Sequence, residues 1–372
     1  MTKTVLITGG AGFIGAHVAR ELLAHGYSVR ALDSLVPQVH GPDRRRPAYL
    51  PSDVHLTVGD VRDSEAVIHS LRGVDAVIHL AALVGVGQSM YQIAEYTSVN
   101  NEGTAVLLET LSARPIEKLV VASSMSIYGE GSYVDEDGDP REGYDRPLEQ
   151  LKNADWELRD SAGRALIPIP TPETKAPSLA SVYALSKFDQ EQLCLMLGRA
   201  YGIPAVALRF FNTYGPDQAL SNPYTGVLSN FASRVLNGNP PLIFEDGLQK
   251  RDFVSVYDVA RACRLALESS SAAGHAMNIS SGVPMTVREV AERTVRAIGA
   301  PGIEPRITGN YRAGDIRHCF ADISLAKQLL GWEPVVTLEQ GLGDLAQWLQ
   351  SQTAVDRGVE ARAELAARGL LV

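Results

Sequence analysis

The feature that most constrains the fold of this chain is a glycine-rich stretch near its start, Thr8-Gly-Gly-Ala-Gly-Phe-Ile-Gly15. An apolar run at residues 4–8 leads into it, and a helical pattern over residues 13–25 follows it. An uninterrupted apolar run is typical of a parallel strand that is covered on both faces. Glycines between such a strand and a helix let the backbone approach a pyrophosphate at the helix N-terminus. The cofactor-binding residues expected in this stretch are Gly9, Gly12, Phe13, Ile14 and Gly15.

Short apolar runs alternate with helical patterns through the first half of the chain. The expected strands cover residues 4–8, 28–33, 54–59, 76–80, 119–123 and 204–210. The expected helices cover residues 13–25, 63–72, about 92–113 and 181–201. This alternation predicts an α/β fold with a Rossmann-type, doubly wound parallel sheet.

An acidic residue ends the second expected strand. Asp33 follows Gly15 by 18 residues, and its carboxylate is placed to accept hydrogen bonds from both hydroxyls of an adenosine ribose. It would also repel a 2′-phosphate, so NAD is favoured over NADP. The arginine run at residues 44–46 is a counter-signal, which we interpret as solvated loop. After the third strand, Asp60 is placed to accept from the adenine amino group and Val61 to line the ring.

We assign residues 1–214 to an NAD-binding domain whose last strand lies at about 204–210. Residues 215–352 form mainly a smaller α/β substrate-binding domain, and residues 353–372 form a C-terminal helical tail. An insertion interrupts the first domain at about residues 133–180. It is acidic, proline-rich and poorly periodic, and we expect it to be loop-like. It is either a solvated surface excursion or a lid or partner-binding element.

Composition narrows the class of partners. The net charge is -9, which argues against nucleic acid or an anionic membrane as the main partner. The three cysteines, Cys194, Cys263 and Cys319, are far apart and form no C-x-x-C, so we expect no disulfide framework and no metal site. The N-terminus has no signal-peptide pattern and no apolar run reaches ~18 residues. We therefore expect a cytoplasmic protein that does not cross a membrane.

A tyrosine and a lysine four residues apart, Tyr183 and Lys187, lie on one face of an expected helix. A free tyrosine titrates near ~10 and is a poor base at neutral pH. A lysine cation beside it, and a cationic nicotinamide ring above it, favour the phenolate. Tyr183 is then a plausible acceptor for the proton of a substrate hydroxyl that loses hydride. Such pairs often only decorate a surface helix, but the glycine stretch and Ser124 favour the catalytic interpretation.

Together, these residues resemble the extended short-chain dehydrogenase/reductase family, and within it the nucleotide-sugar epimerases and dehydratases. The resemblance covers roughly residues 3 to 350. The motifs that carry it beyond the glycine stretch are His79-Leu-Ala-Ala82, Asn100, Ser123-Ser124-x-x-x-Tyr128-Gly129, Tyr183-x-x-x-Lys187, Arg209-Phe-Phe-Asn212-x-Tyr-Gly-Pro216, Arg251-Asp-Phe-Val254 and Arg312-x-Gly-Asp315.

The resemblance implies a role for each matching residue. Ser124 shares the reacting sugar oxygen with Tyr183, and Lys187 binds the nicotinamide ribose. The residues implied to line or hold the cofactor are Ala81, Ala82, Asn100 and Ser123. The residues implied to bind substrate are Asn212 at the diphosphate, and Arg251, Arg312 and Asp315 at the nucleotide half. Arginine suits a diphosphate because its fork matches two oxygens at once. The resemblance also implies a homodimer formed through the helices at about 92–113 and 181–201.

The absence of an acidic pair after Ser124 narrows the range of reactions that the family resemblance allows. The dehydratases of the family place a Thr-Asp-Glu trio where this chain has Ser124-Met125-Ser126, so dehydration is disfavoured. A plain C4 epimerase needs only the tyrosine, serine and lysine with NAD. The insertion and residues 204–226 resemble the bacterial subgroup related to dTDP-L-rhamnose 4-epimerases, although cysteine pairs found in some relatives are absent here. UDP-glucose/UDP-galactose 4-epimerase is the alternative. A simple reductase and a non-catalytic NAD-binding sensor are less favoured.

Overall fold

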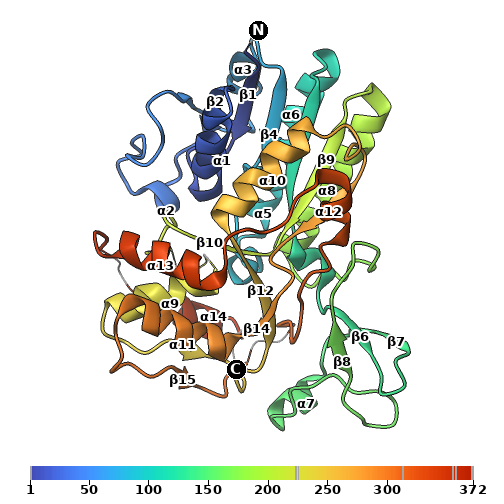
Figure 1. The fold of residues 1–372 in the computed structure, drawn as a ribbon, viewed down its shortest axis with the longest axis vertical. Helices are drawn as coiled ribbons and strands as arrows, with labels where there is room; N and C mark the ends of the chain where they lie inside the picture. The colour runs from blue at the N-terminus through green and yellow to red at the C-terminus, as the bar shows by residue number, and fades with distance from the viewer. Residues whose placement is uncertain are drawn as a thin grey trace.

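A seven-stranded parallel sheet is the centre of the first domain, which occupies the upper half of the molecule in Figure 1. The computed structural model describes residues 2–369 apart from 223, 225, 312, 313, 354, 355 and 357. The strands run in the order β13-β9-β5-β4-β1-β2-β3. Their bounds are β1 (Thr4–Thr8), β2 (Ser28–Asp33), β3 (His55–Val58), β4 (Ala76–His79), β5 (Lys118–Ser124), β9 (Ala205–Phe210) and β13 (Ala276–Ile279). From β1 the chain adds β2 and β3 on one side and then crosses over to add β4 on the other side. In such sheets the ligand binds at the carboxyl ends of the two strands where the order reverses, here β1 and β4.

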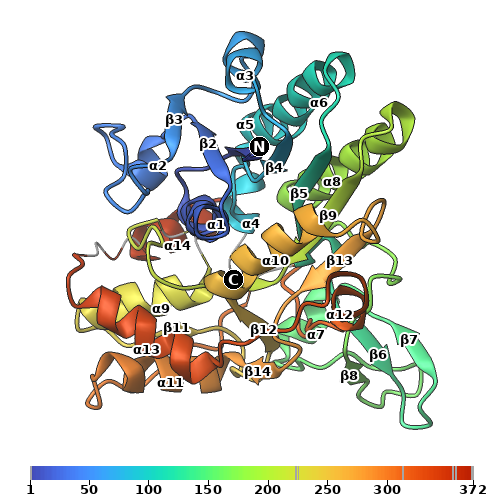
Figure 2. The same cartoon turned by 45° about the horizontal axis from the view of Figure 1, so that its top comes forward.

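Helices cover both faces of this sheet (Figure 2). Val5 and Ile7 of β1 belong to the core on one face, and Leu6 belongs to the core on the other, as strand alternation requires. The helices that pack on the first face are α1 (Phe13–Ala24) and α10 (Val256–Glu268). Those on the second face are α3 (Ser64–Ser70), α6 (Gly103–Ala113) and α8 (Val182–Tyr201). This double cover confirms the predicted Rossmann-type fold.

The prediction that residues 204–210 form the last strand of the sheet is wrong. β13 pairs with β9 in parallel and adds a seventh strand at the edge. It is only four residues long and lies in the sequence among short turns, so its apolar signal is weak. Helix α12 (Ser324–Leu330) packs against it, so the chain returns to the first domain after residue 270.

A second lobe lies against the carboxyl edge of the sheet. Its helices are α9 (Val227–Leu236), α11 (Val287–Ile298) and α13 (Leu338–Leu349). Its strands are β10 (Asn212–Tyr214), β11 (Leu242–Ile243), β12 (Lys250–Ser255), β14 (Pro284–Thr286) and β15 (Arg306–Ile307). Thr286 and Thr337 each begin a helix with a capping box, which satisfies backbone donors at the helix start.

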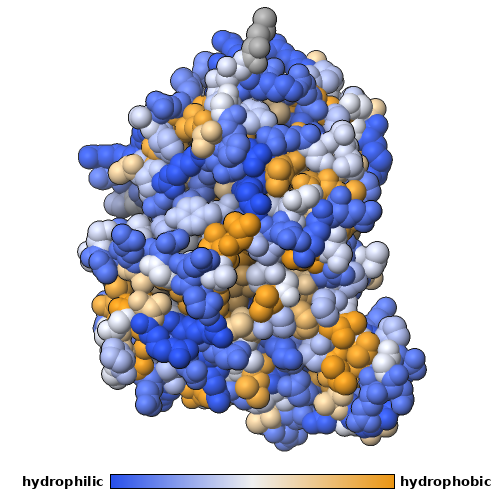
Figure 3. Space-filling view, viewed as in Figure 1, coloured by the Kyte–Doolittle hydropathy of each residue, from blue (hydrophilic) through white to orange (hydrophobic). Residues whose placement is uncertain are grey.

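The insertion is folded rather than loop-like. Its strands β6 (Ser132–Val134), β7 (Pro140–Glu142) and β8 (Ile167–Ile169) form a small antiparallel sheet, joined by helix α7 (Leu148–Lys152). Tyr133, Leu158 and Leu166 form its core. Strands of three residues are too short to show periodicity, which is why the sequence pattern missed them. In Figure 3 the insertion projects at the lower right of the molecule.

Shorter elements complete the fold. The helix expected at 92–113 is α5 (Ile93–Tyr96), a π-helical segment (Thr97–Glu102) and α6. The others are α2 (Pro37–His40), α4 (Val86–Ser89), a 3₁₀ helix (Met125–Tyr128) and α14 (Gly358–Ala367), which lies in the expected helical tail. Across the described ranges, no helix has both the length and the apolar character needed to cross a membrane.

Candidate active site and cofactor cleft

The glycine turn between β1 and α1 forms a cradle that side chains cannot enter. Gly9 has a φ of +70°, and a Cβ there would stand 2.9 Å from the Ala81 nitrogen. A Cβ on Gly15 would collide with the Gly9 carbonyl oxygen. Helix α1 begins after Gly12, and none of the described side chains caps it. Its first N–H groups are therefore directed at the space that a pyrophosphate requires, with Phe13 and Ile14 in the first turn.

Asp33 lies beside this cradle at the end of β2. Its Oδ2 accepts from the Ala11 N–H at 3.0 Å, and its Oδ1 accepts from the Leu35 N–H at 2.9 Å. These bonds fix the carboxylate and leave lone pairs for ribose hydroxyls. The nearby arginine run is exposed, yet Arg44 donates to the Ser34 carbonyl at 2.6 Å. Arg46 likewise donates to the Val54 carbonyl at 3.1 Å, so two arginines of this exposed run are tied to nearby backbone.

Asp60 already has a strong partner. Arg62 donates to its Oδ2 at 2.7 Å and to its Oδ1 at 3.0 Å. This side-chain hydrogen bonding lowers the pKa of Asp60 against the opposing effect of burial. A contact between Asp60 and adenine stays a prediction, because it must share the carboxylate with Arg62. Val61 is buried and packs closely against Gly103 at the start of α6.

The proposed catalytic residues meet where β5 ends and α8 begins. Ser124 is the last residue of β5, and Tyr183 lies in the first turn of α8, which Ser181 caps by accepting from the Ala184 N–H. The Tyr183 backbone N–H donates to the Ser89 hydroxyl at 3.0 Å. Burial raises the pKa of the Tyr183 phenol, and a hydrogen bond with Ser124 opposes that rise. The structure therefore places this phenol near enough to the serine hydroxyl for the two to interact, while their joint contact with a sugar oxygen stays a prediction.

Lys187 lies one turn after Tyr183 and is also buried. Burial lowers the pKa of its ammonium group to about 8. Its Nζ donates to Gln190 Oε1 at 2.8 Å. In the structure, burial raises the pKa of the Tyr183 phenol and Ser124 opposes that rise, so support of the phenolate by Lys187 stays a prediction.

The sequence interpretation missed Gln190. Its Nε2 donates to Thr104 Oγ1 at 2.8 Å and lies 3.3 Å from His79 Nε2, while the other nitrogen of His79 lies 2.7 Å from Thr8 Oγ1. A buried chain of polar groups thus runs from the glycine turn to Lys187. Burial lowers the pKa of His79 to about 3, so its ring is neutral. The i, i+4, i+7 spacing of Tyr183, Lys187 and Gln190 was the available signal.

The remaining residues predicted to hold the cofactor lie near the end of β5 and in the loop after β4 that α8 contacts. Asn100 donates to Ser186 Oγ at 2.9 Å and accepts from the Leu83 N–H at 2.7 Å, which ties the loop after β4 to α8. Ala81 and Ala82, half-buried, line that loop. Within the described chain, the buried hydroxyl of Ser123 has no hydrogen-bond partner. An orphaned hydroxyl at the edge of the cleft fits a site that a polar cofactor completes.

The pairing of strands places the predicted substrate residue Asn212 close to the end of β5, where Ser124 lies. Ser124 lies opposite Phe210, and two residues later Asn212 lies opposite Phe253 of β12. Asn212 donates to the Asp252 carbonyl at 3.1 Å.

Two of the residues predicted for the nucleotide half are neighbours. Arg251 lies 4.0 Å from Asp315 and donates to the Arg317 carbonyl at 2.9 Å. Arg312, the second predicted arginine, lies outside the described residues.

Comparison with known proteins agrees with this geometry. The chain matches the family described as the NAD dependent epimerase/dehydratase family over residues 5–150 and 163–280. The dTDP-L-rhamnose 4-epimerase of Burkholderia thailandensis is 34% identical over 355 residues, which cover 94% of this chain and 96% of the relative. A putative UDP-glucose 4-epimerase of Methanocaldococcus jannaschii is 30% identical, with 93% of this chain and 98% of the relative covered.

Solved structures of nucleotide-sugar epimerases are also similar to this chain. The UDP-glucose 4-epimerase of Thermus thermophilus, determined as a complex with NAD, has a TM-score of 0.73 and is 31% identical. The alignment covers 94% of this chain and 100% of the Thermus thermophilus chain. The UDP-glucose 4-epimerase of Thermotoga maritima, determined with UDP-glucose, has a TM-score of 0.74 at 29% identity, with 93% and 98% covered. The chain therefore belongs to the NAD dependent epimerase/dehydratase family, and the dinucleotide of its glycine cradle is NAD.

Proposed function

We propose that this protein is a nucleotide-sugar 4-epimerase that interconverts dTDP-L-rhamnose and dTDP-6-deoxy-L-talose. The observation that carries the reaction type is the contact between Ser124 and the buried phenol of Tyr183, one turn from Lys187. The two residues after Ser124 are Met125 and Ser126, and the Ser126 hydroxyl donates to Ser124 at 3.0 Å. Neither has the carboxylate that expelling a 6-hydroxyl requires, so oxidation and reduction at C4 is the chemistry that the site supports.

In this mechanism Tyr183 takes the proton of the 4-hydroxyl, and Ser124 hydrogen-bonds the same sugar oxygen. NAD, when bound, supplies the acceptor and donor of the hydride, so no external oxidant is consumed. The ammonium of Lys187 favours the phenolate electrostatically, against the effect of burial. The 4-keto sugar turns about its diphosphate and presents its other face. Tyr183 then returns the proton, and the configuration at C4 is inverted.

The choice of sugar rests on the insertion, on residues 204–226 and on the similarity to the Burkholderia thailandensis relative, which spans nearly the whole of both chains. UDP-glucose/UDP-galactose epimerisation is the second candidate. It is favoured by the similarity to UDP-glucose 4-epimerases, among them the Thermus thermophilus structure. A UDP-N-acetyl-alpha-D-glucosaminuronate decarboxylase of Bacillus cytotoxicus is 29% identical, but we find no additional acid-binding cluster among the described residues that would favour decarboxylation.

The test is an assay of UDP-, dTDP- and GDP-sugars with the purified protein and no added cofactor, scored for inversion at C4. We expect the dTDP-deoxysugar to be converted most rapidly. Faster conversion of UDP-glucose would favour the second candidate. A requirement for fresh NADPH at each turnover would identify a reductase, and failure to invert any sugar would contradict the proposal.

We also infer that the protein is a homodimer. Helices α6 and α8 pack together on one face of the sheet, and the family resemblance implies that a four-helix dimer interface forms through them. Helix α8 exposes Leu185 and Met196, with 52% and 49% of their surfaces accessible. These positions are 11 residues apart, about three helical turns, so they lie on one face. An exposed apolar stripe on a long helix is the kind of surface that a second copy covers.

A further inference from the structure

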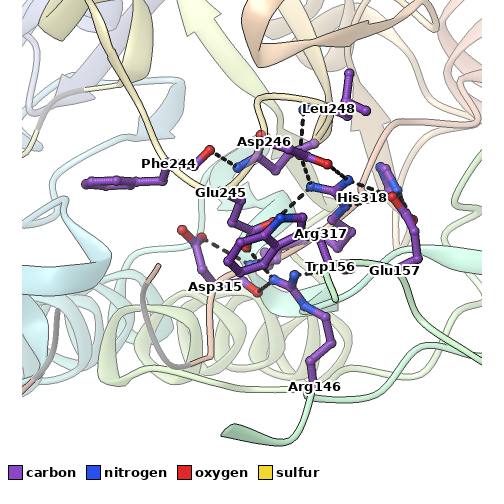
Figure 4. Close-up of polar contacts among 12 residues, drawn as sticks. Arg146, Trp156, Glu157, Phe244, Glu245, Asp246, Leu248, Asp315, Arg317 and His318 are labelled. Atoms are coloured by element: carbon purple, nitrogen blue, oxygen red, sulfur yellow. Dashed lines mark hydrogen bonds and ion pairs between the residues drawn. The ribbon is translucent and has the colours of Figure 1, made fainter. Parts of the chain in front are cut away.

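Buried and partly buried charges join the insertion to the segments that carry the predicted substrate residues (Figure 4). We call this set the bridging network. Its members are Arg146 and Glu157 from the insertion, Glu245 and Asp246 from the loop before β12, and Arg317 and His318 after Asp315. The three segments are far apart in sequence. A surface excursion needs no such connection, so the network indicates what the insertion does.

Arg317 is the centre of the network. Its side chain is 0% exposed, and its guanidinium donates to Glu157 at 2.6 Å, to Asp246 at 2.7 Å and to Glu245 at 2.9 Å. Arg146 donates to the other oxygen of Glu245 at 2.7 Å. A buried cation is costly unless it is paired and fully hydrogen-bonded, and here the pairs come from both sides of the boundary. Removing one partner therefore disturbs the geometry of the whole segment.

The backbone of the same segment holds Arg251. The guanidinium of Arg251 donates to the carbonyl oxygens of Lys250, Ile316 and Arg317. Within the described chain, these carbonyls occupy three of its five N–H groups. The position of residues 316–317 thus sets the direction in which the fork of Arg251 points, and that segment is itself held by Glu157 through Arg317.

His318 gives a second path from Glu157 to β12. The backbone N–H of Lys250 donates to His318 Nδ1 at 3.0 Å, so this nitrogen is the acceptor. Nε2 then carries the proton and donates to Glu157 at 3.0 Å. A third path is direct, because Arg146 donates to the carbonyl oxygen of Asp315 at 2.9 Å. The insertion therefore contacts the neighbourhood of both described residues of the nucleotide half.

We propose that the insertion is a structural wall of the nucleotide-sugar site and that Glu157 is a positioning residue, which acts through Arg317 and His318 to aim Arg251 at the substrate diphosphate. This inference rests on the proposed function. We expect the insertion to affect the affinity for substrate and not the rate of hydride transfer. The reason is that the bridging network has no direct contact with Tyr183, Ser124 or Lys187 in the described structure.

The test uses the full-length, NAD-loaded protein and measures binding of dTDP and of UDP by calorimetry, together with kcat and KM for the converted sugar. Glu157→Gln preserves shape and removes the charge. We expect its Kd and KM to rise ~5-fold with kcat unchanged, the size expected for a residue that acts on a site through another. Glu157→Asp keeps the charge and should restore binding to within ~2-fold, while Asp155→Asn, at an exposed pair of the same insertion, is the matched control.

A double-mutant cycle with Arg251→Ala decides the path. If Glu157 acts through Arg251, Glu157→Gln adds nothing once Arg251 is removed. Unchanged nucleotide affinity in Glu157→Gln, or the same loss in both backgrounds, would overturn the inference even though the parent binds nucleotide and inverts its sugar. A parent that binds neither dTDP nor UDP would contradict the proposed function as well. Melting temperatures of all variants exclude loss of fold as the cause.

Discussion

The phenol of Tyr183 is the group on which the proposed proton transfer depends. Replacing it by phenylalanine keeps the ring in its buried position and removes only the oxygen that touches Ser124. We expect kcat to fall at least ~100-fold, as for the loss of a positioned general base. The measurement is the initial rate of C4 inversion. Tyr201→Phe, at an exposed site on the same helix, should leave the rate unchanged.

Retention of NAD by the Tyr183→Phe variant distinguishes loss of the general base from loss of the folded cofactor site. Tyr183→Phe should still carry NAD through purification, read as absorbance that elutes with the protein. Near-full activity of the variant would remove Tyr183 from the mechanism. Loss of both NAD and activity would mean that the residue holds the cofactor and that its role as base is unsupported.

The contact between Lys187 and Gln190 predicts how the activity depends on pH. Burial lowers the pKa of Lys187 to about 8, and the bond to Gln190 favours the protonated form. Because the protonated lysine supports the phenolate, activity should fall as pH rises through that value. Gln190→Leu removes the acceptor, so the pKa of Lys187 drops further and the alkaline limb of the kcat profile moves to lower pH.

The profile is measured from about pH 6 to pH 10, with KM determined at each point. A variant that loses activity equally at every pH, with no movement of the alkaline limb, would show that Gln190 has only a packing role. Gln190→Glu, which keeps an acceptor for Lys187 and adds charge, should move the limb the other way.

The candidate catalytic side chains could be named from sequence because they lie in short motifs with fixed spacing. In the structure the motifs lie at the carboxyl ends of three strands of the sheet or begin α8: the glycine stretch follows β1, Asp33 ends β2, Ser124 ends β5, and Tyr183 and Lys187 lie in the first turns of α8. The role of Arg317 could not be predicted in this way. Its charged partners lie 72 and 160 residues away, and only the folded insertion brings them together.

At the scale of elements, the insertion should respond to acid. Burial raises the pKa of Glu157, but hydrogen bonds from His318 and Arg317 outweigh it and lower the pKa to about 2 from its usual value of 4.5. A carboxyl whose pKa is lowered on folding stabilises the fold above its unfolded pKa, and this contribution is lost as pH falls toward the folded value. We expect the insertion to loosen between about pH 4.5 and pH 2.

Trp156 is the natural probe, because it precedes Glu157 and its ring lies 6.0 Å from that of Tyr311. Its near-ultraviolet circular dichroism and fluorescence should change across this range. In Glu157→Gln the change should be smaller, since that side chain no longer titrates. An equal change in both proteins would place the acid-sensitive contact elsewhere.

The elements that sequence predicted well are long or uniformly apolar. The strands of the first half and helix α8 have clear patterns, and Ser181 and Gly202 mark both ends of the helix. The elements missed, β6, β7, β8 and β13, have three or four residues each. They form because neighbouring strands and helices cover them, and that tertiary contribution is invisible in a local pattern.

At the scale of the whole molecule, the proposed dimer follows from the outer surface of α8. A stable interface buries about 800 Å² on each partner around an apolar centre, and Leu185 with Met196 offers such a centre. Helix α5, which packs on α8, adds the exposed Ile93. We expect sedimentation at micromolar concentration to give twice the mass of one chain. The Leu185→Asp and Met196→Asp double variant should sediment as a monomer, because a desolvated carboxylate at the centre is costly. Val335→Asp, at an exposed apolar site away from α8, should remain dimeric. A monomeric parent would contradict the proposal, and it would also mean that α8 positions Tyr183 without support from a second copy.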